Sequence, residues 1–255
     1  MSRATDLDGM LQASKGRVLK RRVVRHDRDL TGKELCIFGT AEMAELADYY
    51  FAYDYGLNVS KFVVDDAFVE GGVFLKRPVL SWSEFVSAHT PQSTAVHVAL
   101  SYRQMNDVRA AKFEQVKRAG FEMPSYISSK AVSWPDLTYG ANCFVLELQN
   151  LQPRVVLGNN VMLWSMNHIG HGSVIKDHAY LASGITVSGH VTVGEKSFIG
   201  VGAQIRDFVT IGSQALIGMG ASVTKDVGDG EVVLGAQSTI LTASDNTSER
   251  IKGSM

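Results

Sequence analysis

The chain has 255 residues, of which 45% are hydrophobic, and its formal net charge is −1 at pH 7. A chain of this size buries a sizeable core and has room for two domains. The near-zero charge disfavours nucleic acid or an anionic membrane as partner, and the apolar runs are too short for membrane insertion.

Residues 1–33 are predicted to be a basic N-terminal extension, with acidic residues among its lysines and arginines. No aromatic platform accompanies these charges, so we expect a solvated extension rather than a nucleic-acid-binding arm. The segment has no apolar centre and does not resemble a signal peptide. Cys36 and Cys143 have no metal or redox spacing, which favours buried thiols and a cytoplasmic location.

Residues 34–127 alternate between strand and helix patterns. The predicted elements are a strand at 34–38, a helix at 41–53, strands at 59–64 and 94–100, a helix beginning at Ser81 and a helix at 104–119. Ser81 and Glu84 have the spacing of a capping box, and Gly120 closes the last helix. This order predicts a small parallel sheet covered by helices, whose ligands lie beyond the carboxyl ends of the strands.

Three strand ends are therefore candidate ligand-binding sites. They consist of Gly39, Thr40 and Ala41; Asp65 and Asp66; and Ser101 and Tyr102. The first resembles a phosphate-binding loop but lacks the full G-x-G-x-x-G pattern. Simple turn formation at Gly39 and strand termination at Asp65 are the alternative interpretations.

Every sixth residue from Val145 to Val223 is Leu, Ile or Val, fourteen times in succession. A period of six fits neither a helix nor a simple strand, and it predicts a triangular β-helix of eighteen residues per coil with the repeated residue pointing inward. The hexads in phase run from about Val132 to Val227, or roughly five coils and a column about 24 Å tall. The period does not determine the handedness of the coil.

Four histidines, His168, His171, His178 and His190, fall within two coils of this column and outside the inward position. His171 is expected at a corner with open space beside Gly189, as a general base near neutral pH. His168 is the second candidate, and His178 and His190 are expected to face solvent. Metal binding is the alternative, but no further ligand completes a tetrahedral set, so we predict no metal.

Over residues 34–238 the chain resembles the bacterial sugar acyltransferases of the PglD/NeuD-like group. The hexapeptide region, C-I-F-G-T-A-E-M-A and V-V-D-D carry the resemblance. It implies a Rossmann-like α/β domain at 34–127, an all-β left-handed parallel β-helix at 128–240 and a polar tail at 241–255. It also implies a homotrimer, acetyl-CoA bound between neighbouring columns and a nucleotide-sugar between the small domain and an adjacent column.

Carried over by position, the group's catalytic histidine falls on His171 in N-H-I-G-H-G-S-V-I. Its second histidine falls on Tyr180, and the acidic residue after the catalytic histidine falls on Gly172. Asn167, Asp177 or a neighbouring chain is therefore expected to orient His171. The implied acetyl-CoA contacts fall on Gly189, Val201, Met219, Gly220 and Lys225. The implied nucleotide-sugar contacts fall on Gly39, Thr40, Ala41, Asp65, Asp66 and Ser101, with Tyr180 added as a substrate contact.

The sequence therefore predicts an acetyl-CoA-dependent N-acetyltransferase for a nucleotide-linked amino sugar in surface glycan synthesis. His171 acts as general base in direct transfer, with no covalent intermediate. The alternatives are O-acetylation of a sugar hydroxyl, as in sialic acid, and a non-catalytic binding scaffold. The sugar, the nucleotide base and the acyl group stay open.

Overall fold

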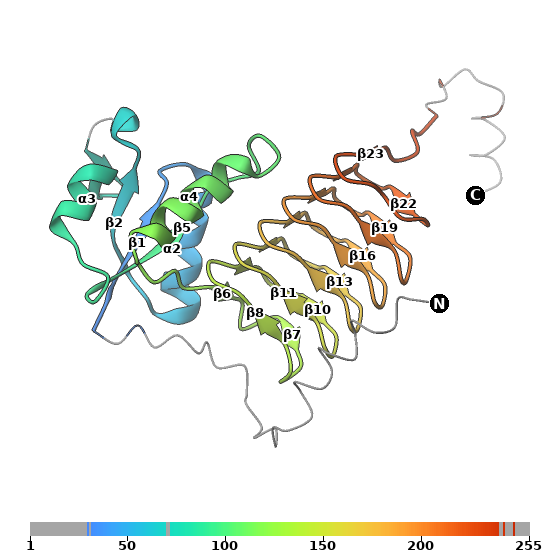
Figure 1. Cartoon of the computed structure of the whole chain (residues 1–255), viewed down its shortest axis with the longest axis horizontal. Helices are drawn as coiled ribbons and strands as arrows, with labels where there is room; N and C mark the ends of the chain where they lie inside the picture. The colour runs from blue at the N-terminus through green and yellow to red at the C-terminus, as the bar shows by residue number, and fades with distance from the viewer. Residues whose placement is uncertain (1–29, 31, 70–71, 240–241, 243–246, 248–255) are drawn as a thin grey trace.

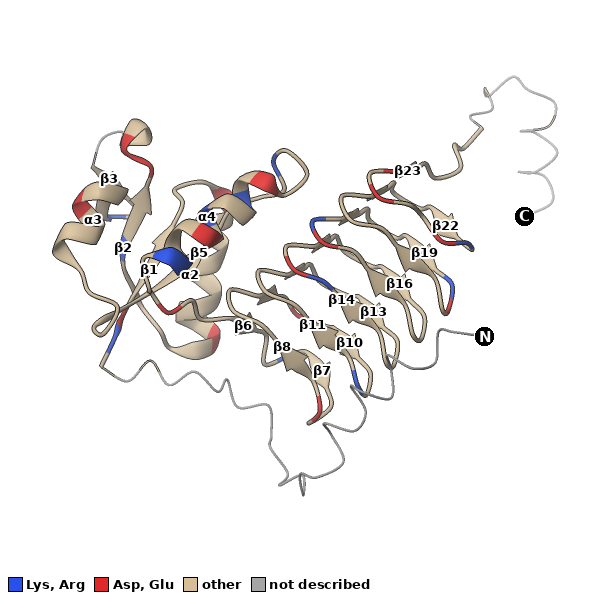
Figure 2. Cartoon of the chain, in the orientation of Figure 1, with Lys and Arg blue, Asp and Glu red and all other residues tan. Residues whose placement is uncertain are grey.

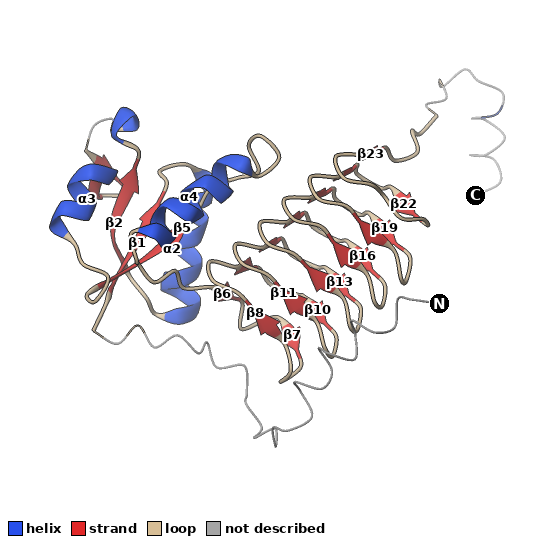
Figure 3. Ribbon diagram, viewed as in Figure 1, coloured by secondary structure: helices blue, strands red, loops and turns tan. Residues whose placement is uncertain are grey.

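A computed structural model describes residue 30 and residues 32–69, 72–239, 242 and 247. The predicted extension at 1–33 and tail at 241–255 lie largely outside the described residues. A small α/β domain is followed by a column of short strands, and all the longer helices drawn belong to the small domain (Figures 1 and 3).

The sheet of the small domain has the order β3-β4-β2-β1-β5. Its strands are β1 (Glu34–Phe38), β2 (Val59–Val64), β3 (Val73–Phe74), β4 (Arg77–Ser81) and β5 (Thr94–Val98). Strands β1, β2, β4 and β5 are parallel, and β3 pairs antiparallel with β4. Every residue of β1 and β5 except Glu34 is buried, because both faces of the sheet are covered.

The helical elements are α2 (Glu42–Tyr55), η1 (Asp66–Phe68), α3 (Trp82–Ala88) and α4 (Asp107–Arg118). Helix α3 starts with the expected capping box between Ser81 and Glu84. Helix α4 begins three residues later than predicted because Gln104, Met105 and Asn106 have left-handed φ angles of 51°, 49° and 68°. The Asn106 amide donates to the carbonyl of Lys196 in the column, so a tertiary contact overrides local helix propensity there.

The column is a three-sided prism of parallel two-residue strands. Face 1 contains β7 (Val132–Ser133), β10 (Asn150–Leu151), β13 (His168–Ile169), β16 (Thr186–Val187), β19 (Gln204–Ile205) and β22 (Ser222–Val223). Face 2 contains β8 (Thr138–Tyr139), β11 (Val156–Leu157), β14 (Val174–Ile175), β17 (Thr192–Val193) and β20 (Thr210–Ile211). Face 3 contains β6 (Tyr126–Ile127), β9 (Phe144–Val145), β12 (Met162–Leu163), β15 (Tyr180–Leu181), β18 (Phe198–Ile199), β21 (Leu216–Ile217) and β23 (Val232–Val233).

The repeated Leu, Ile and Val residues fill the interior of the prism, as their period predicts. Each pairs with the residue eighteen positions away, for example Leu151 with Ile169 and Ile169 with Val187. Face 3 has seven strands, so the prediction of five coils was too low: β6 and β23 extend the column to about 29 Å at the usual strand spacing. None of the column strands contains Lys, Arg, Asp or Glu. Figure 2 shows the charged residues of the column at the turns between strands.

Face 3 carries the small domain. Its outward residues Tyr126, Phe144, Met162 and Tyr180 are buried in one apolar cluster with Phe51 and other residues of α2. The Tyr50 and Tyr126 rings, 5.3 Å apart, join the two parts, as do the hydrogen bonds of the Tyr55 hydroxyl to the backbone of Ile127. The aromatic outward positions of this one face therefore place the domain on the column.

Candidate functional site

His171 lies on the edge between faces 1 and 2, in the turn that follows β13. We call this the histidine edge, and it contains His171, Gly189, His190, Phe208 and Lys225. Because Ile169 points inward and is fully buried, the residue two positions later is turned outward and is exposed. The repeat thus delivers an imidazole to the surface of a rigid column.

Gln152, one coil below, holds His171. Its side-chain oxygen accepts the backbone N–H of His171 at 2.9 Å and lies 3.2 Å from Nδ1 of the same residue. The groups suggested by sequence for this role are engaged elsewhere. The Asn167 amide bonds to Trp164 and Ile185, and the Asp177 carboxylate accepts from Asn159. Asn167 and Asp177 were therefore the wrong choices.

The open space expected beside Gly189 is occupied by the imidazole of His171 itself. A Cβ atom at Gly189 would lie 2.8 Å from Cε1 and 3.0 Å from Nε2 of that ring. The glycine therefore makes room for the ring of the candidate base. The backbone N–H of Gly189 donates to no acceptor in the part of the chain that the structure describes.

His190 approaches His171 from the next coil, with ring centroids 5.0 Å apart and an edge-to-face angle of 86°. It is half-buried, not solvent-facing as expected, because it also stacks on the Phe208 ring at 5.1 Å. Gly172, where the family resemblance implies an acidic residue, provides the space: a Cβ atom there would lie 2.8 Å from Nδ1 of His190.

His168 projects from face 1, where its Nδ1 lies 3.2 Å from the Asn150 amide. It is half-buried and belongs to a face, so the structure does not place it on the histidine edge with His171. As a second catalytic residue it stays a prediction.

His178 was expected at the surface and is buried, so that prediction was wrong. It lies on the edge between faces 2 and 3, which α4 covers and which we call the docked edge. Asn142 pairs with the backbone of Val98 through both ends of its amide, and Asn160 connects Asn142 to Nδ1 of His178. Burial lowers the pKa of His178 to about 4, and the positive charge of Arg109 adds to the effect.

Arg109 of α4 is a fully buried cation at this docked edge. Its guanidinium donates to Asn106 Oδ1 at 2.8 Å, to the carbonyl of His178 at 2.7 Å and to the carbonyl of Asn160. Desolvation lowers its pKa to about 10. Three neutral oxygens hold the charge, which makes the docking of α4 geometrically specific.

At the first predicted nucleotide-binding strand end, Gly39 has a φ of 132° and follows β1 directly. A Cβ atom there would meet the carbonyl oxygen of Ala99 at 2.7 Å, so only glycine fits. Thr40 leads to Ala41, whose carbonyl accepts the first hydrogen bonds of α2. The turn therefore presents the N-terminus of a helix at the carboxyl end of the sheet.

Asp65 and Asp66, at the end of β2, already have partners. Asp65 pairs with Lys112 of α4 at 2.6 Å. Asp66 accepts the backbone N–H of Ser83 at 2.9 Å, and this hydrogen bond lowers the pKa of Asp66. Ser101 is exposed in the loop after β5. These residues meet at one end of the sheet, and their contact with substrate stays a prediction.

Tyr180, the position where the family resemblance implies a second histidine, is only 4% exposed. Its hydroxyl accepts from the Trp164 indole N–H, and its ring stacks on Phe198 at 5.3 Å. Burial raises the pKa of Tyr180 to about 12. Tyr102, directly after Ser101, lies 5.0 Å from the Tyr180 ring. It joins face 3 to the carboxyl end of the sheet, which we call the ligand end because the predicted nucleotide-sugar contacts lie there.

The structure divides the predicted acetyl-CoA contacts between two edges of the prism. Gly189 and Lys225 lie on the histidine edge. Val201, Met219 and Gly220 lie on the edge between faces 3 and 1, which we call the methionine edge. Met219 is 75% exposed, and no atom lies near the position of a Cβ at Gly220. The filled interior of the column separates the two edges, so one column does not bring all five together.

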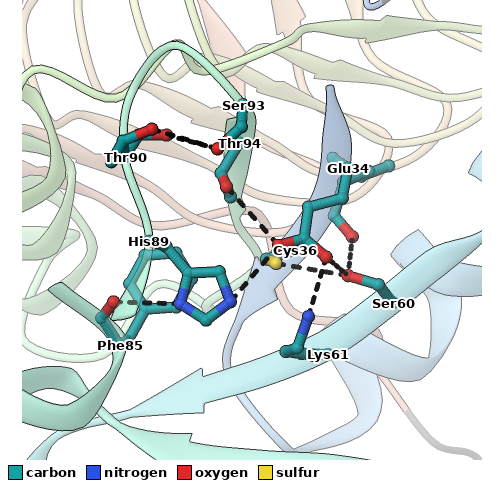
Figure 4. A network of polar contacts seen from close by, with 10 residues as sticks. Glu34, Cys36, Ser60, Lys61, Phe85, His89, Thr90, Ser93 and Thr94 are labelled. Carbon is teal, nitrogen blue, oxygen red and sulfur yellow. Dashed lines mark hydrogen bonds and ion pairs between the residues drawn. The ribbon is translucent and has the colours of Figure 1, made fainter. Parts of the chain in front are cut away.

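A polar network around Glu34 and Cys36 lies at the amino ends of β1 and β5, away from this ligand end (Figure 4). Glu34 accepts from Lys61 at 2.7 Å and pairs with His89 at 3.2 Å. Burial raises the pKa of the Cys36 thiol to about 11, so it is not an activated nucleophile. Among the described residues, no three His, Cys, Asp or Glu side chains group as metal ligands. None of the helices described there has the length and apolarity of a membrane span.

Comparison with solved structures connects this geometry to known proteins. The acetyltransferase domain of PglB from Neisseria gonorrhoeae, in complex with acetyl coenzyme A, is 24% identical at a TM-score of 0.70, over 80% of this chain and 97% of that chain. A variant perosamine N-acetyltransferase from Caulobacter crescentus, in complex with CoA and GDP-perosamine, is 22% identical at a TM-score of 0.70, over 79% and 93%. WeeI from Acinetobacter baumannii is 22% identical at a TM-score of 0.62, over 80% and 97%.

The chain has the fold of these acetyltransferases. The α/β domain followed by a left-handed parallel β-helix, expected from the resemblance, is thereby confirmed. No protein-family model and no curated protein sequence matches the chain.

Sequence reasoning missed Gln152, Phe208 and Arg109. Gln152 is nineteen residues before His171, one more than a coil, so the register alone points to Pro153 instead. Arg109 looks like an ordinary helix residue in the sequence, and only the docking of α4 reveals its role. A search for polar residues eighteen residues before His171, widened by one position on each side for the reach of a side chain, identifies Gln152.

Proposed function

We propose that the protein is an acetyl-CoA-dependent N-acetyltransferase that acts on the amino group of a nucleotide-linked amino sugar. The reaction serves surface glycan synthesis in the cytoplasm, and the active form is a homotrimer. The observation that carries the proposal is the exposed imidazole of His171, held through Nδ1 and packed against Gly189, whose backbone N–H donates to no acceptor among the described residues. The acetyltransferases with the same fold support the reaction class.

In this reaction Nε2 of His171 accepts a proton as the sugar amine attacks the thioester carbonyl carbon. The C–N bond forms, and the carbonyl oxygen gains negative charge that the N–H of Gly189 stabilises. Collapse of this intermediate breaks the C–S bond, and the proton on His171 passes to the leaving thiolate. Both substrates are held together, so the protein supplies proximity as well as the base.

The division of the predicted contacts between edges supports the proposed homotrimer. The histidine edge, the methionine edge and the ligand end of the small domain face three different sides of one column. A second column placed beside the first brings one chain's histidine edge against another chain's methionine edge, and a threefold arrangement repeats this contact in a closed ring.

The test of activity combines the full chain with acetyl-CoA and a panel of UDP-, dTDP- and GDP-linked amino sugars, and measures thiol release. We expect release with at least one acceptor and its loss in His171→Ala. Unchanged turnover in His171→Ala rejects the mechanism, and no release with any acceptor favours a binding scaffold. Treatment of the product with hydroxylamine separates the two transfers, because a sugar ester is cleaved and an amide survives.

Subunit complementation tests the shared site. His171→Ala removes the base, and Met219→Arg blocks the methionine edge with a charged side chain at an exposed position. Each variant alone is expected to be inactive. Co-expression restores activity at about a quarter of the sites if neighbouring chains supply the two edges. Absence of recovery in verified mixed trimers contradicts the shared site.

A further inference from the structure

Gln152 makes two hydrogen bonds to one residue, and one of them fixes the direction of its amide. The backbone N–H of His171 is only a donor, so the atom that faces it at 2.9 Å is the Gln152 oxygen. The same oxygen faces Nδ1 of His171 at 3.2 Å. An oxygen without a proton requires a donor on the other side, and Nδ1 therefore carries the hydrogen.

This assignment leaves Nε2 of neutral His171 with its free lone pair. A histidine that serves as general base through Nε2 needs this tautomer. In many enzymes a carboxylate selects it, whereas here a neutral amide makes the contact. The amide fixes the tautomer without adding a negative charge beside the ring.

Two further contacts limit how the ring rotates. Gly189 lies against the ring at the distances given above, and His190 meets it edge-on at 86°. His190 occupies the space above Gly172, where a side chain would collide with its Nδ1 and the backbone φ is 67°. A side chain at position 172 would therefore require the His190 ring to move. Among the described residues, the titratable group in ring contact with His171 is His190.

We propose that Gln152 is the positioning residue of the active site and selects the Nδ1–H tautomer and the orientation of His171. The inference rests on the proposed function, because it assigns how the base of that reaction is prepared.

The test compares three variants of the full chain: Gln152→Leu, Gln152→Glu and His171→Ala. Leucine keeps the volume and removes the acceptor, so kcat falls about 10- to 100-fold while the KM for acetyl-CoA changes little. Glutamate restores an acceptor and retains most of kcat. Because its negative charge stabilises a protonated imidazole, the acid limb of the pH profile moves to higher pH by about one unit.

Nitrogen-15 NMR of histidine-labelled protein provides a readout without turnover. The wild type is expected to show His171 as the Nδ1–H tautomer above neutral pH, and Gln152→Leu a mixture of both tautomers. Thermal unfolding checks that each variant is folded, and Gln152→Asn repeats the measurement with a shorter amide if leucine unfolds the turn. His171→Ala gives the reference for complete loss of the base.

Wild-type kcat and an unchanged tautomer in Gln152→Leu overturn the inference, provided that His171→Ala is inactive. A Gln152→Glu profile that superimposes on the wild type overturns it as well. If His171→Ala is fully active, the proposed mechanism itself fails. The two failures are therefore distinguishable.

Discussion

The histidine edge and the docked edge are built from the same repeat, yet their histidines differ in exposure and in whether Nδ1 donates or accepts a hydrogen bond. On the histidine edge Nδ1 of His171 donates to Gln152, and the ring is exposed. On the docked edge Nδ1 of His178 accepts from Asn160, and the ring is buried under α4 beside Arg109. The repeat places both residues in turns, and the neighbours decide which ring meets solvent.

The amide networks explain the opposite tautomers. Each network begins at a backbone N–H, that of His171 itself in one case and that of Val98 in the other. At the histidine edge the Gln152 oxygen accepts this N–H and also faces Nδ1, so Nδ1 must donate. At the docked edge the Asn142 oxygen accepts the N–H, its NH₂ group donates to Asn160, and the NH₂ group of Asn160 donates to Nδ1 of His178, which must accept. Exposed turns of a β-helix are therefore not equivalent, and histidine function follows from what covers each edge.

The sharpest way to break this comparison is to remove each histidine in turn. His171→Ala is expected to lower kcat/KM by about 10²- to 10⁴-fold with little change in melting temperature, because it removes an exposed base. His178→Ala is expected to do the reverse, because it removes a buried side chain from the docked edge. Thiol-release kinetics measure the change in kcat/KM of both variants, and thermal unfolding measures the change in their melting temperatures. Equal loss of activity in both removes the distinction between the edges.

The docked edge is expected to depend most strongly on Arg109. Arg109→Ala leaves two buried carbonyl oxygens without their donor and opens a cavity, at a cost of about 2–4 kcal/mol in unfolding free energy. Thermal or denaturant unfolding measures the loss. Arg118→Ala at the exposed end of the same helix is the control and is expected to change stability by under about 0.5 kcal/mol. A similar small effect for Arg109→Ala contradicts its role in docking.

At the histidine edge, Gly189→Ala tests whether the base needs the space under its ring. The added Cβ displaces the imidazole, and we expect kcat to fall about tenfold because small misplacements of a catalytic group are costly. Ser213→Ala, at the equivalent turn position on the edge between faces 2 and 3, is the control with near-normal kcat. Unfolding curves for both variants are expected to match the wild type. A Gly189→Ala enzyme with normal kcat shows that the ring adapts without loss.

The smallest effect concerns pH. Because the pKa of His178 is lowered to about 4, the unfolded chain binds more protons than the folded one between about pH 4 and 6.5. Stability is therefore complete above this window and is lost as pH falls through it. Fully buried His97 has a pKa lowered to about 4 by desolvation and contributes in the same direction.

His178→Asn isolates one contribution. Asparagine tolerates the φ of 62° at this turn and accepts from Asn160 as the imidazole does. The variant is expected to match the wild type at pH 7.5 and to lose less stability on acidification to pH 5, by thermal unfolding across the range. Parallel curves for the two proteins remove His178 as a source of the pH dependence.

The sequence by itself determined the column, since a six-residue apolar period has one structural solution and fixes which residue points outward. It also located β1, β2, β5 and the capping box of the small domain, where local signals are strong, but it missed β3 and β4. It placed His171 at a corner because Ile169 two positions earlier must be buried.

Only the tertiary structure decided which corners are covered and what holds each side chain. The burial of His178 and the position of Arg109 depend on the docking of α4, which joins residues 69 positions apart. The hydrogen bond from His171 to Gln152 depends on side-chain reach across coils, which the repeat does not encode. A period fixes directions within one element, whereas the environment of a side chain is set by elements that the period does not include.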